Sequence, residues 1–230
     1  MPTSQHLQIN AIMDFIIDTN PSKLLDIGVG FGKYGFLSRE YLEFWDGRDQ
    51  YGGWLRLIDG IEAYEKYITP VHKFIYNTIF IGNALDVLPT LENKYDLILI
   101  IDVLEHFSRE DGLKLLQECL IHGKNILISV PKHVIFRGKA FNNPYEAHVF
   151  QWEKSHFRQL FPEIVFSDIG GSLIVYMGEK SHEFLRERRL APIKEFQKRM
   201  NFLYFSVRAV LISMINLVHL KQPLKRLLNR

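Results

Sequence analysis

The sequence of 230 residues contains a single cysteine, Cys119, so it cannot form an internal disulfide bond. It has no charge-free apolar run of 18 residues, because Arg208, Asn216 and His219 interrupt the most apolar segment, residues 202–220, and we do not expect a membrane-spanning helix. No segment near Met1 resembles a secretion signal, which favours a cytoplasmic protein. Internal repeats and low-complexity segments are also missing from the sequence.

Apolar residues make up 47% of the chain and aromatic residues 13%, which is enough to build one sizeable hydrophobic core. The net charge of +2 conceals an asymmetry. Residues 181–230 contain 11 Lys and Arg against 3 Asp and Glu, whereas residues 1–180 contain 17 against 23. We therefore predict an acidic body over residues 1–180 and a basic extension over residues 181–230, and the charge of the body disfavours binding along nucleic acid phosphates.

Hydrophobic periodicity in the body predicts alternating helices and strands. Helices are expected over residues 7–17, 36–44, 70–76, 108–121 and 153–161. Strands are expected over residues 23–27, 54–61, 78–81, 95–101 and 125–130. This alternation predicts a parallel sheet with right-handed crossovers. Two more strand-like runs, residues 164–169 and 173–177, are joined by Gly170-Gly171-Ser172, which predicts an antiparallel hairpin that closes a seven-stranded sheet.

A glycine-rich turn follows the first predicted strand. Gly28, Gly30 and Gly32 occupy alternate positions between this strand and the next helix. Glycine allows the backbone to turn tightly and to approach a bound ligand closely. Asp26 stands at the end of the strand, where its carboxylate can face that ligand. The turn is therefore predicted to be a cofactor site.

Polar residues also end the second and third predicted strands. Glu62 ends the second strand, where a carboxylate can accept both hydroxyls of a ribose. Asp59 lies three residues earlier, on the opposite face of the strand, and is expected to solvate the strand or a nearby loop. Asn83 and Ala84 follow the third strand, where an amide can either reach an adenine or cap the turn.

The fourth predicted strand ends abruptly in polar residues. Asp102, Glu105 and His106 follow a run of seven residues of which six are apolar. The carboxyl ends of parallel strands line the ligand crevice of an open sheet. We therefore expect this cluster to face whatever binds at the glycine turn.

Four motifs together resemble those of the class I S-adenosylmethionine-dependent methyltransferases: Asp26-x-Gly28-x-Gly30-x-Gly32, Gly60-x-Glu62, Gly82-Asn83-Ala84 and Ile101-Asp102-Val103-Leu104-Glu105-His106. They are most similar to a bacterial small-molecule group that shares the Leu-Glu-His signature with quinone-biosynthesis methyltransferases. The resemblance covers about residues 7–177 and implies a Rossmann-like, doubly wound α/β fold, with a methyltransferase domain over residues 1–180. One departure is Asn83, where the family usually has Asp.

The resemblance implies S-adenosylmethionine as the cofactor. It also implies that the cofactor is bound by Asp26, Gly28, Gly30, Gly32, Glu62, Asn83, Ala84, Asp102 and Val103. A NAD-dependent oxidoreductase is the less favoured alternative, because evenly spaced glycines and a terminal hairpin are not typical of a dinucleotide fold.

Methyl transfer from a sulfonium needs no metal, but it can need a base that removes a proton from the acceptor. His106 and His148 are the candidate bases, with Glu105 beside them, because a neutral imidazole takes up a proton near pH 7. A structural role stays open for both histidines. His133 and Arg137, in the long loop over residues 131–151, are candidates for binding an acidic substrate group. The histidines and the cysteine show no metal-ligand spacing, and no metal is expected.

The acceptor is expected to be a small molecule, a glycan or a lipid. The extension over residues 181–230 has an apolar helical face near residues 200–220 with basic flanks. This face can be buried against the body, against a second copy in a homo-oligomer, or on an anionic membrane surface as a peripheral contact. Nucleic acid is a less favoured partner. A non-catalytic module that uses the extension for assembly or membrane docking is the alternative function from a different class.

Overall fold

The computed structural model describes residues 5–44, 53–134 and 143–187, together with Leu190, Gln197, Met200, Phe202 and Ser206. The chain divides into two units, Met1–His182 and Glu183–Arg230. The described residues of the second unit are helical. The predicted apolar face over residues 200–220 lies outside the described residues except at Met200, Phe202 and Ser206.

The first unit contains seven strands and two kinds of helix. The strands are β1 (Lys23–Ile27), β2 (Leu57–Glu62), β3 (Thr78–Ile81), β4 (Leu97–Ile101), β5 (Asn125–Pro131), β6 (Ile164–Ile169) and β7 (Ser172–Gly178). The α-helices are α1 (Ile9–Thr19), α2 (Lys33–Glu43), α3 (Pro70–Ile75), α4 (Ala84–Val87), α5 (Arg109–His122) and α6 (Lys154–Phe157). Short 3-10 helices are η1 (His6–Gln8), η3 (Glu65–Tyr67), η4 (Leu88–Thr90), η5 (Leu104–His106) and η6 (Pro144–Glu146).

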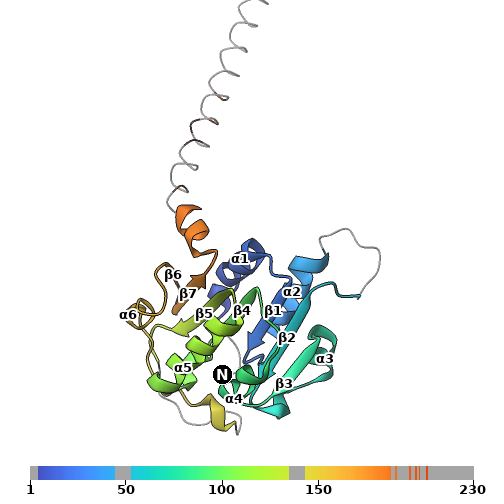
Figure 1. Cartoon of the computed structure of the whole chain (residues 1–230). Helices are drawn as coiled ribbons and strands as arrows, with labels where there is room; N and C mark the ends of the chain where they lie inside the picture. The colour runs from blue at the N-terminus through green and yellow to red at the C-terminus, as the bar shows by residue number, and fades with distance from the viewer. Residues whose placement is uncertain are drawn as a thin grey trace, which may run out of the picture. The chain divides into compact units, whose positions relative to one another are not determined.

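The strands form one twisted sheet in the order β3-β2-β1-β4-β5-β7-β6 (Figure 1). The first five strands pair in parallel, whereas β7 pairs antiparallel to both β5 and β6. The prediction of a mostly parallel, seven-stranded sheet with an antiparallel C-terminal hairpin is therefore confirmed. None of the helices in the described ranges is long and apolar enough to cross a lipid bilayer.

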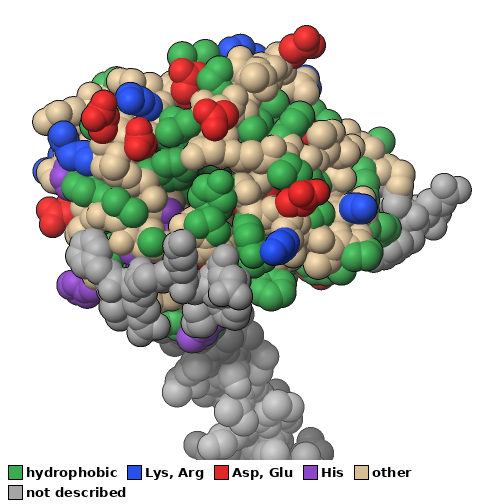
Figure 2. Space-filling model, turned by 90° about the horizontal axis from the view of Figure 1, so that it is seen from below, with side chains coloured by type: hydrophobic (Ala, Val, Ile, Leu, Met, Phe, Trp, Pro, Cys, Tyr) green, Lys and Arg blue, Asp and Glu red, His purple; other side chains and the backbone are tan. Residues whose placement is uncertain are grey.

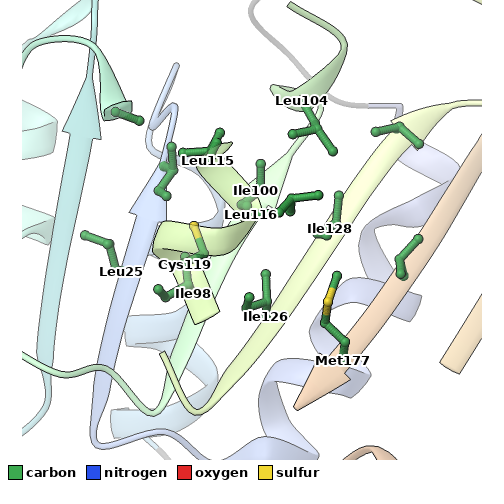
Figure 3. Close-up of a cluster of buried hydrophobic side chains, with 14 of the residues drawn as sticks. Leu25, Ile98, Ile100, Leu104, Leu115, Leu116, Cys119, Ile126, Ile128 and Met177 are labelled. Carbon is green, nitrogen blue, oxygen red and sulfur yellow. The ribbon is translucent and has the colours of Figure 1, made fainter. Parts of the chain in front are cut away.

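The hydrophobic core lies between α5 and the centre of the sheet. Figure 3 shows Leu115, Leu116 and Cys119 of α5 beside the strand residues Ile98, Ile100, Ile126 and Ile128. All five residues of β4 are buried because helices cover both faces of the sheet, which explains its continuous apolar sequence.

Helix α1 covers the opposite face of the sheet. The Phe15 ring stacks on the Tyr176 ring of β7 with a centroid distance of 5.2 Å, and the Thr19 and Tyr176 hydroxyl oxygens are 3.0 Å apart. Tyr176 precedes Met177, which belongs to the core under α5. Successive side chains of a strand point to opposite faces, so helices cover both sides and the fold is doubly wound.

The ends of α5 agree with the prediction. The Ser108 hydroxyl accepts a hydrogen bond from the Asp111 backbone N–H at 3.1 Å and forms the N-cap. Gly123 is the C-cap, and its N–H donates to the Cys119 carbonyl at 2.7 Å. The next strand, β5, begins two residues after this cap.

Several predicted boundaries are wrong by two residues or more, among them the start of α2, at Lys33 rather than residue 36, and the start of β4, at Leu97 rather than residue 95. Strand β2 begins at Leu57 rather than at residue 54, because the Glu43 carboxylate binds the backbone N–H groups of Leu55 and Arg56 at 2.8 and 3.1 Å and holds them out of the sheet. Helix α6 ends at Phe157 rather than at residue 161 and continues as turns.

The expectation that Asp59 solvates the strand or a loop is also wrong. Asp59 is buried, and its Oδ2 accepts a hydrogen bond from the Tyr95 hydroxyl at 2.9 Å. Tyr95 lies just before β4 rather than within it, and its hydroxyl reaches across to β2. The period-2 pattern correctly separates Asp59 from Glu62, but it cannot reveal a buried partner on the other face.

Candidate active site

A cavity of about 450 Å³ opens at the carboxyl ends of the parallel strands. Its walls come from the turns that follow β1, β2, β3 and β4, and from residues 143–149. Nine of the predicted site residues line it: Asp26, Gly28, Gly30, Glu62, Asn83, Ala84, Asp102, Val103 and His106. Gly32, Glu105 and His148 are not among the lining residues. Parallel strands end at one edge of a sheet, so residues far apart in the sequence meet there.

The glycine turn has the left-handed backbone that its sequence suggests. Gly28, Gly30 and Gly32 have φ angles of 75°, 51° and 75°. A Cβ atom on Gly28 would overlap the Val103 side chain, so this wall of the cavity exists only because the position lacks a side chain. Gly32 instead forms the N-cap position of α2.

The Gly30 peptide is fixed on both sides. Its N–H donates to Glu62 Oε2 at 3.1 Å, and its carbonyl accepts a hydrogen bond from His72 Nε2 at 2.8 Å. His72 belongs to α3, where its Nδ1 accepts a hydrogen bond from the Thr69 N–H at 3.1 Å. A helix cap on the neighbouring crossover therefore positions the glycine turn.

Glu62 joins the turn to the end of β2. Besides the bond to Gly30, its Oε1 accepts the Tyr64 N–H at 2.9 Å. Burial raises the pKa of the Glu62 carboxyl, although these two hydrogen bonds oppose the rise. Each carboxylate oxygen has a second lone pair and can still accept a hydroxyl from a ligand in the cavity.

Asp26 is a buried acid beside the turn, with 3% of its surface exposed. The Tyr76 hydroxyl donates to its Oδ2 at 2.6 Å. Burial, with a smaller contribution from the nearby charge of Glu62, raises the pKa of Asp26 to about 6, although the hydrogen bond from Tyr76 acts in the opposite direction. The two acids make this end of the cavity suited to a cationic ligand.

Asp102 occupies a strained position after β4, with a φ angle of 54°. Its Oδ2 accepts a hydrogen bond from Gln8 Nε2 at 2.8 Å, and its Oδ1 lies 2.9 Å from Ser129 Oγ. Gln8 is fully buried, and its Oε1 accepts the Ser129 hydroxyl at 2.5 Å. Burial also lowers the pKa of Lys33 in the cavity wall, against the opposing influence of the Asp102 charge.

The far end of the cavity combines turn chemistry with ligand-facing groups. Asn83 caps α4, since its Oδ1 accepts the Leu85 N–H at 3.0 Å, and it also lines the cavity. Its capping role was one of the two alternatives that the sequence left open, and the two roles are compatible. Across the cavity, the Tyr67 hydroxyl donates to Glu146 Oε1 at 3.0 Å and links η3 to η6.

Glu105, His106 and His148 form one cluster, in which only His106 lines the cavity. One ligand-type atom from each lies within 4.8 Å of the other two. The two imidazole centroids are 4.9 Å apart at an interplanar angle of 62°. Burial raises the pKa of Glu105 well above its ordinary value, with Asp102 adding to the rise, and burial lowers the pKa of His106. Burial therefore favours the neutral form of both groups.

The chain segment that carries His148 is bonded to η5. The Val149 and Phe150 N–H groups donate to the Glu105 carbonyl at 2.7 and 3.2 Å, and Trp152 Nε1 donates to the Leu104 carbonyl at 3.0 Å. The cluster therefore rests on a hydrogen-bonded frame. Of the other predicted loop residues, His133 is exposed, while Arg137 lies outside the described residues.

Several residues of the site have no local sequence signal. Gln8, Lys33, Tyr67, His72 and Tyr76 either line the cavity or hold its acids and glycine turn. They lie on crossovers and on the N-terminal segment, outside the strand-end motifs. Only the three-dimensional arrangement brings them to the site.

No protein-family model matches the chain, and no curated protein matches its sequence. Solved structures do share its fold. An O-methyltransferase family protein from Burkholderia thailandensis aligns with a TM-score of 0.54 at 12% identity, over 74% of this chain and 54% of that one. The methyltransferase domain of a bacterial protein, CtHen1, aligns with a TM-score of 0.50 at 14% identity, over 75% and 98%.

An rRNA methylase from Escherichia coli aligns with a TM-score of 0.49 at 20% identity, over 74% of this chain. The chain spans 62% of the length of that protein. The strand order and the first two likenesses show that this is the fold of the class I methyltransferases.

Proposed function

We propose that the protein transfers a methyl group from S-adenosylmethionine directly to a small-molecule, glycan or lipid acceptor. The observation that carries this proposal is the single cavity wall shared by the glycine turn, the acids Asp26 and Glu62, and His106. It combines features suited to a cationic nucleoside cofactor with a group that can accept a proton. The methyltransferase fold supports the same reaction class.

The residues of the cavity fit this cofactor. We assign Asp26 and the turn at Gly28, Gly30 and Gly32 to its methionine part, where a buried acid can meet an ammonium group. Glu62 is assigned to the ribose hydroxyls, and Asn83 with Ala84 to the adenine. Asp102 and Val103 border the cofactor on the acceptor side. The cofactor supplies an electrophilic methyl group on a sulfonium.

His106 is our first candidate for the general base. Its Nδ1 lies 3.1 Å from the Ala147 carbonyl, which can only accept, so Nδ1 carries the proton and Nε2 keeps its lone pair. His106 lines the cavity, whereas His148 and Glu105 stand beside it. We propose that these two assist His106, and His148 is the second candidate base. In-line displacement then needs only alignment and exclusion of water.

The surface around the site supports a small acceptor. Figure 2 views the molecule from the side on which α4 lies in Figure 1, and α4 follows the cavity-lining residue Asn83. On the visible part of this side, Lys and Arg side chains are scattered among acidic and apolar ones and form no single patch. A protein that tracks nucleic acid needs clustered positive charge.

Residues 181–230 are proposed to be a separate basic extension. Its apolar face over residues 200–220 would contact the body, a second copy of the chain or an anionic membrane surface. Deletion of this extension is expected to preserve cofactor binding and some methyl transfer. A non-catalytic assembly module would instead lose its main interaction in the same variant.

Calorimetry with S-adenosylhomocysteine and NAD, measured side by side, tests the cofactor. Binding of S-adenosylhomocysteine alone is expected, and binding of NAD alone would overturn the proposal. Methyl-labelled cofactor incubated with cell extracts, separated into lipid, glycan, small-molecule and nucleic acid fractions, then identifies the acceptor class. Label confined to nucleic acid would contradict the acceptor assignment while leaving methyl transfer intact.

With an acceptor in hand, His106→Gln is expected to lower turnover about 100-fold while preserving cofactor affinity, because general-base assistance is worth about that much. The matched control is His182→Gln, an exposed histidine outside the cavity lining. Near-normal turnover of both His106→Gln and His148→Gln would show that the acceptor needs neither imidazole as a base.

A further inference from the structure

We infer that Glu105, His106 and His148 together form a binding site for one divalent transition-metal ion. The site itself stands on the geometry of these three side chains. Only the role given to the ion in acceptor chemistry rests on the proposed function. The spacing of these residues does not predict a metal site, because Glu105 and His106 are adjacent and His148 comes 42 positions later.

The three side chains offer a recognised donor set. Two imidazole nitrogens and one carboxylate bind ions such as Mn²⁺, Co²⁺ and Zn²⁺, whereas Mg²⁺ and Ca²⁺ prefer oxygen ligands alone. One donor atom of each residue lies within 4.8 Å of the others. Ligands held at about 2 Å from an ion stand roughly 3–4 Å apart, so the side chains need to close by only about 1 Å.

His106 already has the hydrogen bond that a metal-binding histidine needs. Its Nδ1 donates to the Ala147 carbonyl, and the lone pair is therefore on Nε2. A backbone carbonyl on the second ring nitrogen fixes the ring and its tautomer, and it strengthens the other nitrogen as a ligand. The segment that contains Ala147 also carries His148, so one hydrogen-bonded segment of backbone orients both imidazoles.

Glu105 supplies an independent observation. It is 1% exposed, and among the described residues its Oε2 is buried with no hydrogen-bond partner. Burying a carboxyl oxygen without a partner costs free energy, so such a group is uncommon in a folded protein. An ion between Glu105 and the two imidazoles would give this oxygen a partner and make the buried carboxylate favourable.

The cluster lies where a bound ion could contact an acceptor in the cavity. His106 lines the cavity, while Glu105 and His148 stand beside it. Three protein ligands leave coordination positions open, and a metal-bound hydroxyl loses its proton more readily than a free one. We expect a bound ion to coordinate an acceptor oxygen and to favour loss of its proton. In that case the ion, and not a free imidazole, would prepare the oxygen for methylation.

Titration of the full-length protein with Co²⁺ tests the site without any acceptor. One Co²⁺ per chain is expected, with visible d–d absorption bands that report nitrogen and oxygen ligation. His106→Gln, His148→Gln and Glu105→Gln are each expected to weaken Co²⁺ binding at least about 10-fold. The matched controls His182→Gln and Glu163→Gln change exposed residues and should bind like the unmodified protein.

The result that overturns the inference is absence of stoichiometric Co²⁺ binding, or binding that survives the combined change of His106 and His148. Binding of S-adenosylhomocysteine, measured on the same samples, shows that each variant is folded. It also separates the two proposals. A protein that binds S-adenosylhomocysteine but no Co²⁺ refutes only the metal site, whereas one that binds Co²⁺ but no S-adenosylhomocysteine refutes the proposed function.

Discussion

Replacing Asp26 by Asn removes a buried acid whose ionisation opposes folding. Burial raises the pKa of Asp26 from an ordinary 3.8 to about 6 in the folded protein. Between these values the folded protein holds the proton and the unfolded chain does not, so the proton stabilises the folded state. Stability must therefore fall as the pH rises from about 4 to about 6, and the full cost is present at pH 7.

The size of this cost follows from the two pKa values. The difference between 3.8 and about 6 corresponds to about 3 kcal/mol of unfolding free energy, and most of it develops above pH 4. Asn cannot ionise, so the folded Asp26→Asn variant does not carry this free-energy cost. We expect the unfolding free energy of Asp26→Asn, relative to that of the unmodified protein, to rise by about 2–3 kcal/mol between pH 4 and pH 7.

Urea unfolding at several pH values, followed by tryptophan fluorescence, measures this difference. Trp152 is a suitable probe because it is 1% exposed in the core. The control Asp14→Asn alters an exposed carboxyl on α1 and should stay within about 0.5 kcal/mol throughout. A relative stability of Asp26→Asn that does not change with pH would refute the reasoning. The same variant should also bind S-adenosylmethionine at least about 10-fold more weakly, because it lacks the carboxylate that is proposed to pair with the ammonium group of the cofactor.

Four further changes test the glycine turn, the hydrogen bonds of Gln8 and the packing of Trp152. Gly28→Ala should lower the affinity for S-adenosylhomocysteine, measured by calorimetry, at least about 10-fold, because the position has a φ of 75° and the new Cβ would overlap Val103. Gly30→Arg should abolish binding, because the arginine side chain would fill the cavity. Gln8→Leu should lower the unfolding free energy by about 2 kcal/mol or more, since it leaves Asp102 and Ser129 without their buried partner, and unchanged stability would contradict that network. Gly112→Ala should lower the unfolding free energy by about 1–3 kcal/mol and shift Trp152 fluorescence, because its Cβ would overlap the indole.

The fold could be predicted because its signals are local. Strand β3 has the predicted bounds, residues 78–81, and the hairpin follows from a connection of glycines between two strand-like runs. Two of the errors fall where a group distant in the sequence forms a contact. The Glu43 carboxylate of α2 accepts a hydrogen bond from the backbone before β2, and this strand begins later than predicted. Tyr95 gives Asp59 a buried hydrogen-bond partner. Neither contact has a signature in the residues around it.

The candidate site divides in the same way. Residues at strand ends, such as Asp26 and Glu62, were predictable because parallel strands bring their carboxyl ends to one edge. Their environment was not predictable, since it depends on Tyr76 and His72 from the crossover that carries α3. The sequence therefore indicated which groups meet in the cavity, but not that burial would raise the pKa values of its acids.

Those raised pKa values connect the stability of the protein to the charge of its ligands. Asp26 and Glu62 line the cavity and Glu105 lies beside it, and burial raises the pKa of each. Each acid therefore costs folding free energy when it ionises without a cation nearby. A cationic cofactor in the cavity, or a metal ion at Glu105, would offset that cost by stabilising the ionised form. Methyl transfer turns the sulfonium into a neutral thioether but leaves the ammonium group that is assigned to Asp26, so this acid is expected to bind the product as well as the cofactor.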